Sequence, residues 1–123
     1  MNPMKIYVAH RYNGGTLETL ANIGRAVDVG VEIAKRGHYP FVPHLDCQIA
    51  IQSKGCLPID YYYNSSMAFL QVCDAIFIID AADVDTSKGV KAEFDWAVSH
   101  GFPIYYELAK LPLVVDEKKE ASK

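Results

Sequence analysis

A continuous apolar segment, "DAIFIID" from Asp74 to Asp80, constrains the fold of this chain more than any other feature. Its length and its uninterrupted apolar residues are typical of a strand that is buried on both faces at the centre of a parallel sheet. Parallel neighbours need crossover connections, and these are usually helices. The segment therefore predicts an α/β fold, with further strands and helices on either side of it.

Segments with those two patterns alternate along the rest of the chain. Short β-branched and aromatic runs indicate strands, and apolar residues at spacings of three and four indicate helices. Prolines in the second strand favour an edge position for it. The expected strands are Lys5 to Ala9, Tyr39 to Pro43, Asp74 to Asp80 and Pro103 to Leu108, with a short addition near Val114, and the expected helices are Thr16 to about Arg36, about Ile59 to Val72, and Ser87 to near Gly101.

The first helix is expected to begin at a capping residue, Thr16, and to stop at Gly37. One set of its apolar residues recurs at helical spacing, so these residues share a face and are predicted to meet the sheet. Residues 44–58 are expected to form a long irregular loop of functional importance, and "AADVDT" a second loop. The predicted core face of the helix consists of Leu17, Leu20, Gly24, Val27, Val31 and Ala34.

The alternation of strands and helices predicts one small doubly wound domain, flavodoxin-like or Rossmann-like, over residues 1–112. We expect four to five parallel strands with helices on both faces of the sheet. A polar segment, residues 113–123, is expected to be a frayed C-terminal tail. The length of 123 residues is consistent with one such domain.

Composition and charge exclude several classes of function. The formal net charge is -3 and no run of basic residues reaches five, so nucleic-acid binding through a basic surface is not expected. No apolar run is long enough to span a bilayer, and the N-terminus lacks the pattern of a signal peptide. The three cysteines form no CxxC pair, which favours a reducing cytoplasm.

Familiar cofactor and metal patterns are missing from the sequence. His44, Asp46 and Cys47 lie close together in "HLDC", but no HxxxH or CxxC spacing supports a metal site. The first strand is not followed by GxGxxG, and the chain has no Walker-type loop and no GxSxG elbow. We therefore expect neither a metal nor another cofactor.

Ligands of such sheets bind beyond the carboxyl ends of the strands. That rule selects "HRYNGG", "PHLD", "DAADVDTSKG" and "YYEL" as candidate site segments. They contain polar groups suited to substrate binding. The candidates from these segments are His10, Arg11, Tyr12, Gly14, His44, Asp80, Ser87 and Gly89.

The stretch "SKGVKAEFDWA" combines a helix start with an unusual glutamate. Ser87 can cap the helix, whose free amide groups and dipole favour an anion, although a serine there is more often only a cap. Glu93 lies at the edge of the apolar arc, about 40° from Ala97, and can lean into a partly dehydrated cleft. Helix geometry alone leaves open whether this carboxylate is functional or faces water.

The same stretch, with its Ser87, Gly89, Glu93 and Ala97, resembles the motif D-x-S-x-G-x-x-x-E-x-x-x-A of the nucleoside 2-deoxyribosyltransferase superfamily. "IYVAHRYNGG" looks like the first strand and substrate loop of that superfamily. "AKRGHYPFVP" looks like the end of its first helix and its second strand. The resemblance covers most of residues 4 to 106.

The resemblance implies that Glu93 is a nucleophile that attacks C1′ of a sugar, expels the base and forms a glycosyl ester. It also implies that a serine at position 87 binds a 5′-phosphate, as in the branch that hydrolyses nucleoside 5′-monophosphates, with Arg11 as a charged partner. Tyr12 and Asp80 would line the sugar site. Superfamily members typically form dimers or larger oligomers, so a homo-oligomer is expected.

The sequence departs from the superfamily at Ser66, where an aspartate often orients or protonates the substrate. Asp60, Asn64 and Asp80 are candidates to replace that aspartate. Tyr61, Tyr62 and Tyr63 would stack on a base or, as we favour for at least two of them, pack in the core or at a subunit contact.

Three hypotheses follow. The first is an N-glycosidase of nucleoside 5′-monophosphates, with its base pocket in residues 44–58. The second is a 2-deoxyribosyltransferase that exchanges bases. The third is a nucleotide-binding or sensing module without turnover, which the serine at position 66 favours.

Overall fold

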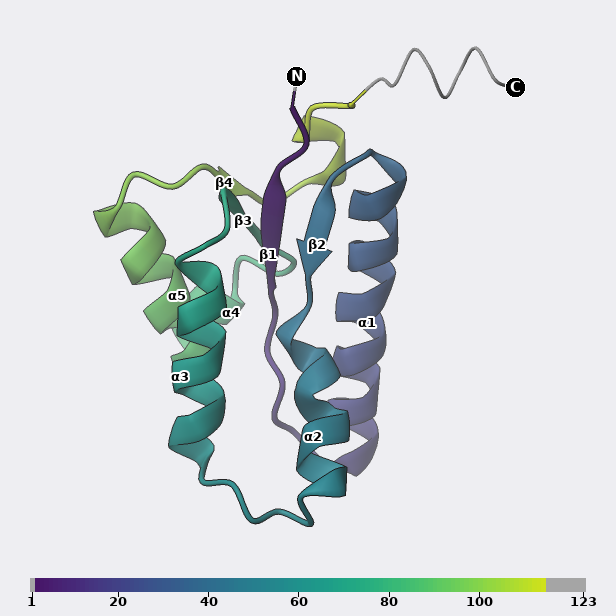
Figure 1. Cartoon of the computed structure of the whole chain (residues 1–123), viewed down its shortest axis with the longest axis vertical. Helices are drawn as coiled ribbons and strands as arrows, with labels where there is room; N and C mark the ends of the chain where they lie inside the picture. The colour runs from purple at the N-terminus through teal and green to yellow at the C-terminus, as the bar shows by residue number, and fades with distance from the viewer. Residues whose placement is uncertain (1, 115–123) are drawn as a thin grey trace.

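The computed structural model describes residues 2–114, and a four-stranded parallel sheet forms its centre (Figure 1). The strands lie in the order β2-β1-β3-β4, so β1 and β3 are the inner strands. All three neighbouring pairs are parallel, which confirms the predicted α/β fold. The strands are β1 (Lys5–Ala9), β2 (Tyr39–Phe41), β3 (Ala75–Ile78) and β4 (Ile104–Tyr105).

The two inner strands end at the same edge of the sheet. Ile6 lies opposite Ala75, and Ala9 lies opposite Ile78. The polar segments that follow β1 and β3 therefore start side by side, as ligand-binding segments of open parallel sheets do. The second strand is at an edge, as its prolines predict.

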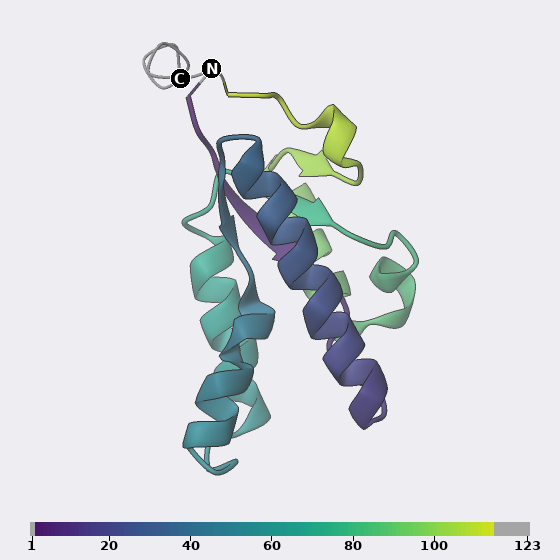
Figure 2. The same ribbon diagram turned by 90° about the vertical axis from the view of Figure 1, so that its right-hand side faces the viewer.

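Helices cover both faces of the sheet (Figures 1 and 2). Helix α1 (Thr16–Lys35) packs on one face, and α3 (Ile59–Leu70) and α5 (Lys88–Ser99) pack on the other. Successive side chains of a strand therefore enter the cores on opposite faces of the sheet. Ile6 and Val8 of β1 belong to the core under α1, whereas Tyr7 and Ala9 belong to the core under α3 and α5. The domain is doubly wound, as predicted.

Two predicted loops contain helices. The 3₁₀ turn Pro43–Asp46 and helix α2 (Cys47–Gln52) occupy more than half of the predicted irregular loop 44–58, because "CQIAIQ" contains no helix breaker. None of the α2 side chains is buried. Within "AADVDT", a single helical turn, α4 (Asp83–Thr86), follows β3.

The predicted core face of α1 is wrong except at Val27, which is partly buried and packs against the core. Leu17, Leu20 and Val31 are exposed, and the helix meets the sheet with its other side. Small residues let the helix approach closely: a side chain at Gly30 would come within 2.9 Å of Val42. The N-cap is Gly15 rather than Thr16. The buried residues of the helix are Asn22, Ala26, Gly30 and Ile33.

The last described segment crosses the end of the sheet remote from the carboxyl ends of the strands (Figure 1). Val114 donates its amide hydrogen to the Arg36 carbonyl at 2.9 Å and has no regular secondary structure, so the strand expected near it does not include residue 114. The remainder of the predicted tail 113–123 lies outside the described residues. Within residues 2–114, no helix is long and apolar enough to cross a membrane.

Candidate functional site

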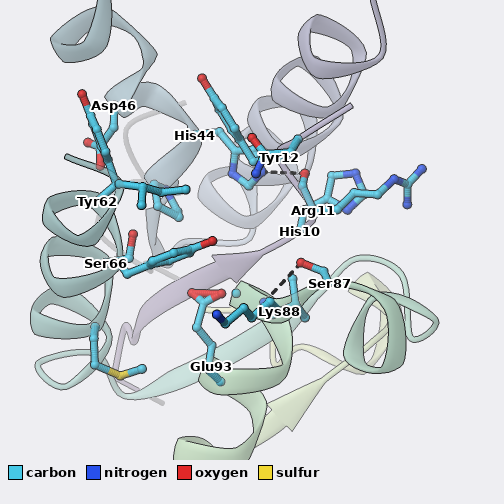
Figure 3. Close-up of a pocket in the computed structure, with 18 of the residues that line it drawn as sticks. His10, Arg11, Tyr12, His44, Asp46, Tyr62, Ser66, Ser87, Lys88 and Glu93 are labelled. Atoms are coloured by element: carbon cyan, nitrogen blue, oxygen red, sulfur yellow. Dashed lines mark hydrogen bonds between the residues drawn. The ribbon is translucent and has the colours of Figure 1, made fainter. Parts of the chain in front are cut away.

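A cavity of about 860 Å³ opens at the carboxyl ends of β1 and β3 (Figure 3). Its walls come from the segment after β1, from the 3₁₀ turn and α2, from α3, and from the start of α5. Most of the residues selected from the sequence line it, although they are far apart along the chain. These residues are His10, Arg11, Tyr12, His44, Ser66, Ser87, Gly89 and Glu93.

Two of the selected residues do not line this cavity in the described part of the chain. Asp80 accepts hydrogen bonds from the Arg11 side chain and the Ala82 amide instead. Gly14 borders a smaller, shallower pocket beside α1, and a side chain there would collide with Glu18 at 2.8 Å.

Glu93 projects from α5 into the cavity (Figure 3). Its side chain is partly buried, and burial raises the pKa of its carboxyl group to about 7. No hydrogen bond or ion pair of standard geometry satisfies this carboxylate among the described residues. A carboxylate that is dehydrated and left without partners is costly unless a ligand uses it, so Glu93 is a strong candidate for a functional group.

Tyr7 of β1 is the polar neighbour of Glu93. Its hydroxyl is fully buried and makes no hydrogen bond of standard geometry with the described residues. Burial raises the pKa of Tyr7 strongly, the Glu93 carboxylate raises it further, and the Ser66 hydroxyl lowers it. Conversely, the Tyr7 hydroxyl opposes the effect of burial on the pKa of Glu93. The pair is therefore a close polar contact rather than a formed hydrogen bond.

A second buried carboxylate, Asp83 of α4, organises the wall beside the cavity. Its Oδ2 accepts from the Nδ1 of His10 at 2.9 Å and from the Arg11 amide at 3.1 Å. Arg25 donates to the Nε2 of His10 at 3.1 Å, so the Nδ1 carries the hydrogen of a neutral ring. Burial lowers the pKa of His10, and this effect outweighs the opposing effect of Asp83. Both nitrogens of His10 are thus engaged within the protein.

Arg11 is also committed to internal partners. Its guanidinium group donates to Asp80 and to Asp83, each at 3.1 Å. Figure 3 shows the Arg11 side chain turned away from Glu93. Two carboxylates already compensate its charge, so the arrangement does not favour the predicted role of Arg11 as the main phosphate partner.

The start of α5 faces the cavity with unused donors. Ser87 is the N-cap, as predicted, and its hydroxyl oxygen accepts from the Val90 amide at 3.4 Å, which leaves the hydroxyl hydrogen free to donate. The amides of Lys88 and Gly89 have no acceptor within the helix, because they belong to its first turn. Lys88 also lines the cavity, and the first turn contains no acidic residue. This end of the cavity suits an anion.

His44 lies in the wall opposite α5. Its Nε2 donates to the Arg11 carbonyl at 3.0 Å, and burial lowers the pKa of the ring. The Nδ1 of His44 and the hydroxyl of Tyr62 are buried atoms without partners in the described chain, as is the Tyr7 hydroxyl. All three residues line the same cavity. Such clustering of unsatisfied polar groups is expected where a ligand completes the structure.

Aromatic rings form the upper part of the cavity. Tyr12 packs against His44, with ring centroids 5.6 Å apart, and Tyr62 stands on the opposite side (Figure 3). Tyr63 also lines the cavity, whereas Tyr61 packs edge-on against Tyr62. Two of the three consecutive tyrosines therefore face the cavity, a placement that suits stacking on a planar ligand.

Acidic groups other than Glu93 also line the cavity. Asp46 and Asp60 contribute to its wall, and Ser66, where the resembling superfamily often has an aspartate, lies beside Tyr7. Burial raises the pKa of Asp46, and His44 lowers it to a smaller extent. Within residues 2–114, no group of three or more His, Cys, Asp or Glu side chains is placed to hold a metal ion.

Comparison with family models assigns the chain to a family of unknown function. Residues 4–107 match the model described as "Domain of unknown function (DUF7768)". The chain belongs to this family. No curated protein matches the sequence at a significant level. The matched residues include every residue that lines the cavity.

Sequence reasoning missed three residues of this DUF7768 site: Tyr7, Asp46 as an individual side chain, and Lys88. Tyr7 lies within an apolar strand, and its alternation with Ile6 and Val8 only indicated that it faces the other core. Lys88 stands between the two residues that the motif identifies. A lysine at the positive end of a helix dipole is the available signal, because an acidic residue is the usual choice there.

Proposed function

We propose that this protein hydrolyses the N-glycosidic bond of a (deoxy)nucleoside 5′-monophosphate, with Glu93 as the nucleophile. The observation that carries the proposal is the partly buried, unpaired Glu93 carboxyl group, whose pKa is raised to about 7, in one cavity with the start of α5. The resemblance of "SKGVKAEFDWA" to the deoxyribosyltransferase motif supports the same roles.

The chemistry follows from a carboxylate beside a sugar carbon. The ionised Glu93 attacks C1′, the bond to the base breaks, and a glycosyl ester forms. Water then adds at C1′ and releases Glu93. Because only the ionised form is a nucleophile, a pKa of about 7 leaves about half of the protein reactive at neutral pH. Tyr7 supports the reactive form, since its hydroxyl favours the carboxylate.

The phosphate site of the proposal is the start of α5. The Ser87 hydroxyl and the amides of Lys88 and Gly89 would donate to the phosphate oxygens, and the Lys88 side chain would supply the charge that Arg11 shares with two aspartates. An exposed lysine that lines the cavity without an ion pair in the described chain supports this assignment.

The base would occupy the aromatic part of the cavity. Tyr12 and Tyr62 offer faces for stacking, and His44 borders the same space. The reaction requires no cofactor in this scheme. We also propose a homo-oligomer, which the exposed apolar side chains Leu17, Leu20 and Ile51 support, and a cytoplasmic location.

A base-release assay tests the proposal. The purified protein is incubated with a panel of ribo- and deoxyribonucleoside 5′-monophosphates and with the matching nucleosides, and free base is measured by chromatography. We expect release from monophosphates only. Glu93→Gln should reduce the rate by about 1,000-fold or more, whereas Asp95→Asn, an exposed carboxylate on the same helix, should leave it unchanged.

Other outcomes separate the remaining hypotheses. Release that requires an added acceptor base would indicate a 2-deoxyribosyltransferase. Tight nucleotide binding that survives Glu93→Gln, without base release by either protein, would indicate a sensing module. Equal release from nucleosides and monophosphates would contradict the phosphate site but not the nucleophile.

A further inference from the structure

Departure of a nucleobase normally needs a proton, and the site lacks an acid where the resembling superfamily often has one. Position 66 is a serine beside Tyr7. The leaving nitrogen of an N-glycoside shares its lone pair with the aromatic ring, so the proton is delivered to a more remote ring atom of the base. The donor should therefore line the base end of the cavity rather than the region next to Glu93.

Most acidic side chains near the cavity are unsuitable as that donor. Asp83 is buried and held by His10 and Arg11, and Asp80 does not line the cavity in the described chain. Asp60 lines it but is exposed to solvent in the first turn of α3.

Asp46 differs from them in its geometry. It is the last residue of the 3₁₀ turn that runs directly into α2, and its side chain makes no hydrogen bond with the start of that helix. Instead it lines the cavity, close to Tyr12 and Cys47. Figure 3 shows both Asp46 and Tyr62 at the end of the cavity remote from Glu93, and both lie near Tyr12. Aromatic surroundings and partial burial favour its protonated form, as the raised pKa of Asp46 indicates.

We propose that Asp46 is the general acid that protonates the departing base. The assignment rests on the proposed function. As the C1′–N bond breaks, its electron pair moves into the base, and the Asp46 proton passes to a ring nitrogen or oxygen. The base leaves neutral, Asp46 becomes a carboxylate, and Glu93 is bound to C1′ as an ester. Water that resolves the ester supplies one proton, which restores Asp46.

A substrate that needs no proton tests this role. Asp46→Asn, Asp60→Asn and the unaltered protein are compared on two substrates: the best monophosphate from the panel, and a 5-phosphorylated furanoside that releases 4-nitrophenolate. We expect Asp46→Asn to reduce kcat/KM for the monophosphate by about 100-fold or more and to change it less than about 3-fold for the nitrophenyl substrate. Asp60→Asn should affect both substrates slightly and equally. Thermal unfolding verifies that each variant is folded.

Each alternative result has a definite meaning. Equal losses on both substrates, or no loss on the monophosphate, would overturn the role of Asp46 and leave the Glu93 nucleophile intact. If Asp60→Asn instead lost activity on the monophosphate and kept it on the nitrophenyl substrate, Asp60 would be the general acid and the proposal for Asp46 would be overturned. Failure of the unaltered protein to cleave either substrate would overturn the proposed function itself, and the role of Asp46 with it.

Discussion

Two carboxylates on neighbouring helices, the buried Asp83 of α4 and the partly buried Glu93 of α5, have opposite surroundings. Asp83 is 1% exposed and accepts hydrogen bonds from His10, from the Arg11 amide and from the Arg11 guanidinium group. Glu93, ten residues later, has no hydrogen bond of standard geometry within residues 2–114, where the Tyr7 hydroxyl is its close polar neighbour. A satisfied carboxylate fixes the loops around it, whereas an unsatisfied one stays reactive. The same type of group thus builds the frame of the site in one place and provides its proposed chemistry in the other.

Removing Asp83 should have the largest effect on stability. Asp83→Ala leaves the buried Nδ1 of His10 and the Arg11 amide without an acceptor, and the Arg11 guanidinium group keeps only Asp80. The free energy of unfolding should fall by about 2–4 kcal/mol, because these donors are left unsatisfied. Urea unfolding at pH 7 measures it. Asp95→Ala, which removes an exposed partner of Lys91, should cost less than about 1 kcal/mol. Similar losses in the two variants would contradict the assigned role of Asp83.

Removing the charge of Glu93 should raise the free energy of unfolding, whereas removing Asp83 should lower it. Its folded pKa of about 7 lies above the ordinary value of 4.5, so the folded state binds the proton more tightly and wild-type stability falls as pH rises from about 4.5 to 7. Glu93→Gln avoids that loss. Its gain in unfolding free energy should be near zero at pH 4 and about 1–3 kcal/mol at pH 8. A gain that does not change with pH in urea unfolding experiments would refute this explanation.

Tyr7 is the polar neighbour of Glu93, and its hydroxyl favours the ionised form of that carboxyl group. With the nitrophenyl substrate, kcat/KM should rise as pH passes through about 7, since only Glu93 must ionise. Tyr7→Phe should move that rise to higher pH by up to about one unit, because the hydroxyl group that lowers the pKa of Glu93 is lost. A profile that falls with pH would instead identify Glu93 as an acid.

Replacing Lys88 should give the smallest change in the free energy of unfolding. Its charge opposes the dipole at the start of α5, so Lys88→Gln should raise the unfolding free energy by about 0.3–1 kcal/mol. The same variant should bind ribose 5-phosphate more weakly in calorimetry and leave any binding of ribose unchanged. Lys91→Gln, one turn further along the helix and paired with Asp95, is the matched control. Equal phosphate affinity in both variants would exclude Lys88 from the phosphate site.

Local sequence patterns were sufficient for the sheet and for the start of α5. The apolar segment that contains β3 and the cap at Ser87 depend on neighbouring residues, so their structure follows from the sequence nearby. The buried face of α1 does not follow from the sequence nearby. Leu17 and Leu20 form a convincing stripe, but the sheet accepts the side with Ala26 and Gly30, because close packing requires small residues.

The other features that the sequence did not predict depend on contacts between residues that are distant in the sequence. Arg11 appeared to be a free cation in a ligand loop, and its ion pair with Asp83 joins positions 72 residues apart. Tyr7 looked like an ordinary strand residue until β1 and α5 were brought together. Asp46 was predicted only as part of a loop, and the structure shows that its side chain lines the cavity and makes no hydrogen bond with the start of α2. No local pattern determines such contacts.

Helix α2 forms one wall of the cavity without contributing a buried side chain to the core. Substitutions along it should therefore leave the fold almost untouched while they reshape the space in which a base would sit. Relatives that diverge in this short helix can acquire different substrate preferences without any compensating change in the sheet. For the same reason, a mutational library confined to residues 47–52 is an economical starting point for redirecting the selectivity of this scaffold.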